Sequence, residues 1–470
     1  MRHVTCFGLA LACTGVLACA AARSQPAGTP PVATQPANDP NSPRVTRLTV
    51  YPAAPPEPAL KYRLLPTYRE LTDENGALMY YQAVTLIDAL SKADPNVDER
   101  VAGWLSLPPQ ELPRGVVREL LGDSDADTAL RYAGYGARCS YCDWGFPARR
   151  SGEGIHALMP SLAPTRTLAR LIALKARVQV ADGEFESALD TLATGYALAR
   201  DAGGAPVLIA SLIGIASGAA CNGPLRELMQ APQGPNLYWA LAAFPQPLVD
   251  MRRAWEGEGL CVETTYPLLA ERHRRELTPD ECTNIMREIL SIGTAEILDP
   301  NRLLAESLAY EGPKARNYLA AHGYSPEKLA AMKPSQLVLA FWLDDYRHWL
   351  DDEFKWFALP YWQAAAGSAH SATRRDKVRA AHDASMLTMT LMPSWERAAF
   401  LRTSLERDLA LLRTVEALRA QLAEHEALPE TLADVTDWPI PLDPVHGESF
   451  EYHVTGDVVI LESPPPPGGR

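Results

Sequence analysis

The sequence predicts an all-α protein, an irregular antiparallel array of helices that ends in a small C-terminal β-hairpin. Apolar residues recur at intervals of three and four across most of residues 61–427, the spacing of helices that bury one face. Helix-start signals such as Thr278-Pro279-Asp280-Glu281 and Ser325-Pro326-Glu327 punctuate this pattern. Within the folded part, the two-residue alternation of a strand is confined to residues 450–461.

Composition and charge narrow the class of protein. The chain has 470 residues, of which 47% are hydrophobic and 21% are charged, as in a globular protein of one large or two to three smaller domains. Its net charge of −13 argues against a nucleic-acid partner, because phosphate binding requires a basic surface.

The N-terminus predicts export. Arg2 and His3 precede a short apolar run over residues 4–18, followed by small residues, which is the layout of a secretory signal peptide. The run Val16-Leu17-Ala18-Cys19 resembles the bacterial lipobox, in which Cys19 would be lipidated and become the mature N-terminus. Cleavage after residues 20–22 as in an ordinary secreted protein is the alternative. We expect a cell-envelope location, either as a membrane-anchored lipoprotein or as a secreted protein.

Residues 23–60 contain ten prolines among small and polar residues, so they are expected to form a disordered, extended tether, with one possible strand at 45–51. The chain thus divides into five segments: a signal peptide (1–22), the tether (23–60), a helical body (61–427), a small C-terminal module (428–463) and a disordered tail (464–470).

Residues 165–206 are the centre of the predicted body. Two amphipathic helices are joined at Ala181-Asp182-Gly183, where the glycine ends the first helix. The pattern Gly183-x-Phe185-x-x-Ala188-Leu189-x-x-Leu192 resembles the second half of a tetratricopeptide repeat, which implies TPR-like, α-solenoid-like hairpins. Lys175 and Gln179 depart from the repeat, its closing proline is missing, and no second copy is clear.

Other segments extend the array on both sides of this hairpin. Residues 72–75 are expected to start a helix over 77–90, and the apolar segment 206–221 is expected to be a buried helix, too short to cross a membrane. Further helices are predicted at the following positions: 97–105, 114–121, 123–135, 237–241, 248–255, 266–275, 278–290, 335–359 and 395–426.

Cysteines offer a first candidate site. Cys139 and Cys142 form a CxxC, which is compatible with a redox pair, half of a zinc site, a local disulfide or two unrelated thiols. No second ligand pair supports zinc, and a helix rather than a strand is predicted before the motif, so a disulfide or unrelated thiols are favoured. Cys261 and Cys282 are candidates for another disulfide.

A second candidate lies in the aromatic segment 335–359. Asp344, His348, Asp351 and Asp352 share one helical face, where they could bind a divalent metal or let a carboxylate orient His348 as a base. The favoured alternative is a solvated acidic face on a helix whose other side packs aromatic residues.

Two further resemblances concern the C-terminal part and the chain as a whole. A long helix, a Leu428-Pro429 turn, the run from Asp443-Pro444 to Tyr452 and a hairpin resemble the C-terminal part of bacterial pseudopilins. The pilin-type N-terminal helix is missing, so no secretion role is implied. Residues 142–144 and 354–362, among other stretches, resemble a group of exported bacterial proteins of unknown activity, which implies the location and the helical fold but no catalytic residues.

These observations favour a non-catalytic helical module that binds or scaffolds a protein or peptide, with a groove beside residues 165–204 as its docking surface and no cofactor. No nucleotide-binding, metalloprotease or serine-hydrolase motif is present in the sequence. The alternatives are an exported hydrolytic or metal-dependent enzyme that uses Asp344, His348 and Asp351, and thiol chemistry at Cys139 and Cys142.

Lipidation is testable by labelling with radioactive palmitate. We expect label in the wild-type protein and none in Cys19→Ala, since acyl chains attach to this cysteine in the lipobox interpretation. Equal labelling of the two proteins, or none in the wild type, would contradict the lipoprotein prediction.

Overall fold

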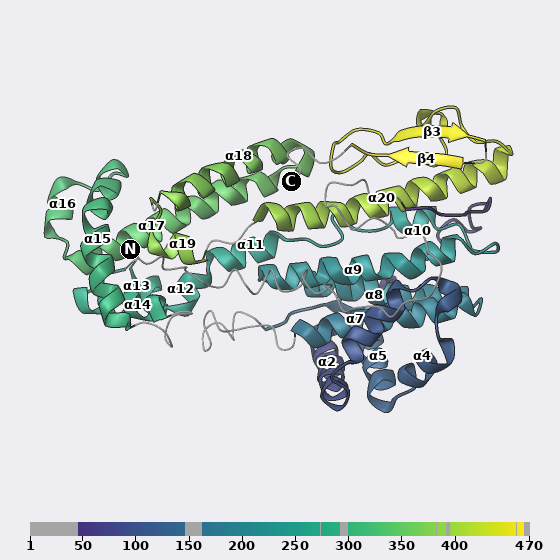
Figure 1. Ribbon diagram of the computed structural model, residues 1–470, viewed down its shortest axis with the longest axis horizontal. Coiled ribbons are helices and arrows are strands. Elements are labelled where there is room, and N and C mark those ends of the chain that lie inside the picture. The colour runs from purple at the N-terminus through teal and green to yellow at the C-terminus, as the bar shows by residue number, and fades with distance from the viewer. Residues whose placement is uncertain are drawn as a thin grey trace, which may run out of the picture.

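The computed structural model describes residues 46–145, 162–272, 274–291, 299–381, 383–391, 395–456 and 458–464. It confirms the predicted fold class, an all-α helical array with a small antiparallel hairpin near the C-terminus (Figure 1). The signal peptide, Cys19 and most of the tail lie outside the described residues.

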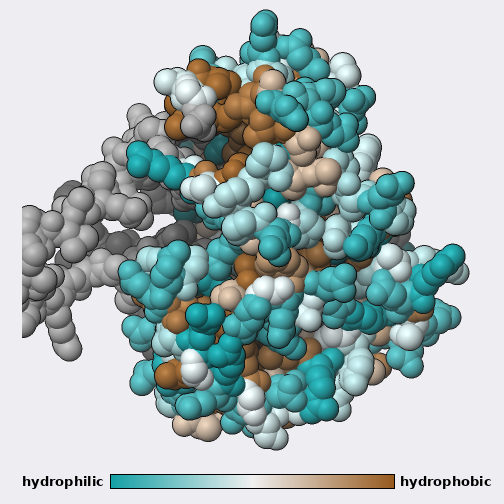
Figure 2. Space-filling view, turned by 90° about the vertical axis from the view of Figure 1, so that its right-hand side faces the viewer, coloured by the Kyte–Doolittle hydropathy of each residue, from teal (hydrophilic) through white to brown (hydrophobic). Residues whose placement is uncertain are grey.

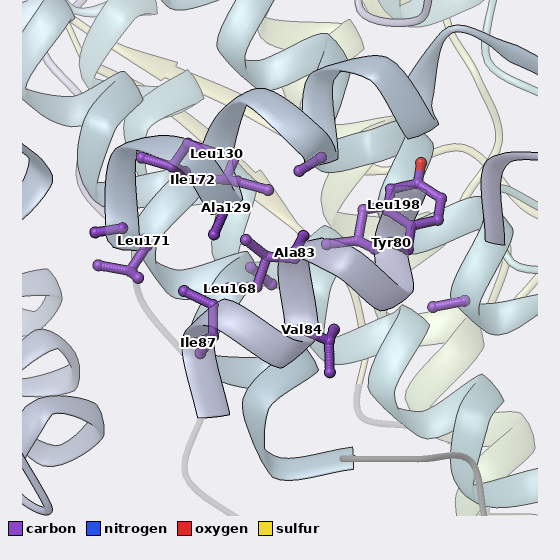
Figure 3. Close-up of a cluster of buried hydrophobic side chains, with 14 of the residues drawn as sticks. Tyr80, Ala83, Val84, Ile87, Ala129, Leu130, Leu168, Leu171, Ile172 and Leu198 are labelled. Atoms are coloured by element: carbon purple, nitrogen blue, oxygen red, sulfur yellow. The ribbon is translucent and has the colours of Figure 1, made fainter. Parts of the chain in front are cut away.

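Among the described residues, seven helices belong to the first part of the array. They are α2 (Gly76–Ala93), α3 (Val97–Ser106), α4 (Arg114–Leu121), α5 (Ser124–Ala137), α7 (Leu162–Ala181), α8 (Phe185–Gly203) and α9 (Leu208–Met229). Side chains of α2, α5, α7 and α8, including Tyr80, Ile87 and Leu168, meet in one buried cluster (Figure 3). Burial of these faces explains the three-to-four-residue periodicity of the sequence.

The predicted central hairpin is present as α7 and α8. Gly183 has φ of +78°, a left-handed conformation that glycine adopts without steric cost, and it ends α7 as expected. Helix α9 then packs on both helices of the hairpin. A Cβ at Gly214 would come within 2.5 Å of the carbonyl oxygen of Ala199, so only glycine permits this close contact of α9 with α8.

Helix α9 is longer than predicted, because it continues through Pro224 to Met229. By length and composition it is the one helix among the described residues that could cross a membrane. It packs against α7, α8 and the later helix α20 (Trp395–His425). Of its most apolar 18-residue stretch, 61% is buried within the protein, which accounts for its apolar sequence.

A second group of helices has its own core. Helices α14 (Pro279–Ser291), α15 (Pro300–Ala321), α17 (Pro334–Phe354) and α19 (Met386–Leu391) bury the side chains of Phe341 and Trp342, among others. The predicted capping signals are confirmed: Glu281 accepts from Thr278 N at 2.8 Å, and Ser325 Oγ accepts from Lys328 N at 3.2 Å.

Shorter elements connect the two groups and flank α20. They are α10 (Tyr238–Ala242), α11 (Arg252–Gly259), α12 (Cys261–Thr265), α13 (Pro267–Glu271), α16 (Pro326–Ala331) and α18 (Tyr361–Ala380). In the part of the chain that the structure describes, short 3-10 helices occur at Tyr68–Glu70, Pro109–Glu111, Lys355–Ala358 and Leu432–Asp434. In Figure 1, α20 runs along α9. Trp395 and Leu405 of α20 belong to the same buried cluster as Leu225 of α9.

The predicted C-terminal hairpin is formed by β3 (Glu451–Thr455) and β4 (Val458–Glu462). On its inner face, Tyr452, Val459 and Leu461 pack against a buried cluster that includes Leu418 of α20 and Tyr238 of α10. Figure 1 shows the hairpin beside α20. Figure 2 shows this end of the molecule, where hydrophobic side chains gather toward the top among hydrophilic ones.

Several predicted boundaries were wrong. A helix does begin directly after residues 72–75, at Gly76, but these residues are themselves extended rather than helical. They form strand β1 (Thr72–Asn75), which pairs in parallel with β2 (Cys139–Tyr141), and the Asn75 side chain caps α2 by accepting from Ala77 N. The helix expected at 248–255 is displaced by four residues, as α11, and the helix expected at 266–275 is shorter, as α13. Residues 46–51 form no strand.

Part of the predicted tether is bound to the body. Arg419 on α20 donates to the carbonyl oxygen of Tyr51 at 2.8 Å, and Ala53 N donates to the carbonyl oxygen of Arg419 at 3.2 Å. Arg419 Nη1 also donates to Glu416 at 2.7 Å, and both side chains are almost completely buried. The tether prediction therefore does not hold for this stretch, because its extended backbone finds hydrogen-bond partners on α20.

Removal of the Arg419 guanidinium is expected to destabilise the folded protein strongly. Arg419→Met leaves the buried Glu416 carboxylate unpaired, which should lower the free energy of unfolding by about 3–5 kcal/mol, measured by urea denaturation. The double variant Glu416→Leu/Arg419→Met should regain part of this loss. Arg302→Met, on an exposed side chain of α15, is the control and should change stability little. A loss below about 1 kcal/mol in Arg419→Met would contradict the importance of the pair.

Candidate functional site

The acidic face predicted as a metal or base site lies on α17, but its side chains diverge. Asp352 is ion-paired with Lys355 and lies 3.3 Å from Arg374, whereas Asp351 is exposed. His348 Nδ1 is 3.9 Å from Asp344 Oδ2, which is longer than a hydrogen bond. The helix thus places the four residues on one face without converging their ligand atoms.

Neighbouring rings occupy the side of this face nearest to α15. The His348 ring meets His322 edge-on at 4.9 Å between centroids, and His322 stacks on Tyr318 at 3.9 Å. Burial, followed by the charges of Asp344 and Asp345, raises the pKa of Tyr318. These contacts pack α17 against α15 instead of directing the four side chains to a common point, so this geometry does not favour the hydrolytic alternative.

The CxxC residues are placed beside the α2–α5 pair. Cys139 is buried at the start of β2, Cys142 is half-buried, and both are free thiols. Burial raises the pKa of both thiols, and the negative charge of Asp201 adds to the effect at Cys142. Reactive cysteines have lowered pKa values, so these surroundings do not favour thiol catalysis.

The other predicted pair is only partly described. Cys282 is a buried free thiol on α14, whereas the side chain of Cys261 lies outside the described residues. Their pairing therefore stays a prediction.

A buried polar cluster next to Cys142 was not predicted. The carboxylate of Asp201, at the end of α8, accepts from Tyr80 Oη at 3.0 Å and from Arg200 Nε at 2.7 Å. The indole of Trp144 donates to the Asp201 carbonyl oxygen at 2.9 Å. Burial raises the pKa of Asp201. These hydrogen bonds tie α2 and α8 to the segment after β2.

A surface groove runs beside the central hairpin, where a docking surface was expected. It has a volume of about 360 Å³ and lies between α3, α7 and α9. Small and apolar side chains make up most of its lining, with two arginines at α7; the lining residues are Ala102, Leu105, Ser106, Arg166, Ala169, Arg170, Ala216, Ser217 and Ala220.

Both arginines of the groove form ion pairs with the same carboxylate. Asp98 on α3 lies 3.0 Å from Arg166 and 2.8 Å from Arg170, and it accepts from Thr167 Oγ1 at 2.8 Å. Burial alone would raise the pKa of Asp98, but the hydrogen bond from Thr167 and the charge of Arg170 outweigh it and lower the pKa. Two guanidinium groups beside a single ionised carboxylate leave the groove with net positive charge.

Comparison with known proteins does not assign the chain to a family. The chain shows no significant similarity to any protein-family model, curated protein or solved structure.

Thiol chemistry can be tested with a coloured thiol reagent. At neutral pH the folded protein and the variant Cys139→Ser/Cys142→Ser should react at the same rate, because both thiols are shielded and their raised pKa values keep them protonated. After unfolding without reductant, the wild type should expose two more thiols than the variant. Fast reaction of two thiols in the folded wild type would support a reactive pair, and an equal count after unfolding would show a disulfide.

Proposed function

We propose that this protein is an envelope-tethered helical module that binds an acidic segment of another protein in the groove between α3, α7 and α9. The observation that carries the proposal is the groove itself, which lies along the first helix of the central hairpin. Proteins of helical-hairpin architecture bind partners along such helix faces.

The lining of the groove suits a peptide with an apolar anchor. Ala169, Ala216 and Ala220 have small side chains, so a ligand can approach the backbones of α7 and α9 closely. A volume of about 360 Å³ is at the lower end of the range for ligand pockets, which is about 300–1,000 Å³. It therefore accommodates one or two anchoring side chains better than a folded surface.

The positive charge of the groove favours a negatively charged ligand. The protein as a whole has a net charge of −13, yet Arg166 and Arg170 stand together at this groove and share one ion-pair partner, Asp98, among the described residues. Guanidinium groups bind carboxylates in a forked geometry, and complementary charge raises both specificity and association rate. An acidic segment is therefore the favoured ligand.

The location of the module follows from its N-terminus. The signal peptide and the lipobox-like Cys19 support a position in the cell envelope. Because residues 49–53 are bound to the body at α20 and α9, a lipid anchor at Cys19 would hold the folded part by a tether shorter than the proline content predicts.

Selection from an unbiased displayed-peptide library tests the proposed binding. The wild-type protein should enrich peptides that combine Asp or Glu with an apolar residue, with binding that weakens as salt is raised. Ala216→Trp should fill the groove and weaken binding of an enriched peptide at least about tenfold, or about 1.4 kcal/mol. The charge reversal Arg166→Glu/Arg170→Glu should shift enrichment from acidic to basic peptides.

Ala219→Trp is the matched control, because Ala219 is exposed on the same helix but does not line the groove. It should bind the enriched peptides like the wild type. A wild-type protein that enriches no acidic peptides, or binding that Ala216→Trp leaves unchanged, would refute the proposal. Circular dichroism confirms that each variant is folded.

A further inference from the structure

We propose that the outer face of the β3–β4 hairpin holds a site for a first-row divalent cation such as Zn²⁺, with Glu451, His453 and Glu462 as its ligands. This inference does not depend on peptide binding in the groove. One ligand atom from each of the three side chains lies within 4.8 Å of the other two, and no other such trio occurs among the described residues.

The strand register brings these side chains together. Glu451 and Glu462 are directly paired across the two strands, so their side chains project from the same face of the hairpin. His453 is two residues beyond Glu451 on β3 and therefore points to that face as well. All three side chains are exposed, whereas Tyr452 and Leu461, their neighbours along the strands, face the core of the C-terminal module.

The distances are compatible with one ion. Zn²⁺ binds imidazole nitrogen and carboxylate oxygen at about 2.0–2.2 Å in tetrahedral geometry, so two ligand atoms of the same ion lie about 3.3–3.6 Å apart. The observed separations, within 4.8 Å, need only small side-chain rotations to reach this range. Strand backbones held against α20 keep the three side chains in place for binding.

The donor set points to this class of cation. A nitrogen ligand between two carboxylates suits Zn²⁺ and other first-row divalent cations, whereas Mg²⁺ and Ca²⁺ prefer oxygen ligands alone. Three protein ligands also leave positions for water or a further ligand, as in open zinc sites. The exposure of the trio keeps those positions accessible.

Without a cation, this face of the hairpin has an unfavourable arrangement of charge. Like charges that are directly opposite on neighbouring strands repel each other and destabilise the pair. Among the residues that the structure describes, neither Glu451 nor Glu462 is ion-paired with a lysine or arginine that would offset the repulsion. A divalent cation would neutralise both carboxylates and fasten β3 to β4.

Calorimetric titration of the full chain with zinc chloride tests this inference. The wild type should bind one equivalent of Zn²⁺. This binding should be absent, or weakened at least about tenfold, in His453→Ala and in Glu462→Gln, since even changes outside the ligand shell weaken metal binding by about 10–100-fold. Exposed residues of the preceding segment supply matched controls: His425→Ala and Glu430→Gln should bind Zn²⁺ like the wild type.

Hydrogen exchange gives a local readout. Zn²⁺ should slow exchange of the amides of β3 and β4 in the wild type and not in Glu462→Gln. In the absence of metal, Glu462→Gln should itself slow exchange slightly, because it removes the repulsion with Glu451. A wild type that binds no Zn²⁺, or that binds it as tightly in His453→Ala, would overturn the proposed site.

Discussion

A buried ion pair between Arg419 and Glu416 joins three parts of the chain that are far apart in sequence. Arg419 donates to the carbonyl oxygens of Tyr51 and Gly234, and Glu416 accepts from the backbone N–H of Leu237. An arginine and a glutamate can be buried together only when their charges are paired and their hydrogen bonds are made, which this arrangement achieves. Since both residues belong to α20, the pair positions this helix against the N-terminal segment and the turn that precedes α10.

The position of α20 determines which surfaces of the array stay open. It covers one side of α9, while α3 covers α7 and α9 on another side only in part and leaves the groove between them. It also supports the inner face of the C-terminal hairpin, so the outer face with Glu451, His453 and Glu462 remains exposed. Both proposed sites are thus consequences of how the helices pack, and each lies where packing leaves polar groups accessible.

Local signals predicted much of the architecture because they act over a few residues. The capping residues Thr278 and Ser325, the glycine at 183 and the alternation in residues 450–461 each depend on neighbouring backbone alone. Candidate sites were harder to predict. Helical spacing placed Asp344, His348, Asp351 and Asp352 on one face, but contacts from other segments decided where each side chain points: Asp352 toward Arg374, and His348 toward His322.

The sequence by itself determined the helical class, the central hairpin and the C-terminal strands, since periodicity, caps and turn residues are local properties of the chain. The tertiary structure alone decided that Asp201 meets Tyr80 across 121 residues, that residues 49–53 bind α20, and that Arg166 and Arg170 share Asp98 beside a groove. These contacts join residues that no periodic pattern relates, because their proximity depends on how whole helices pack.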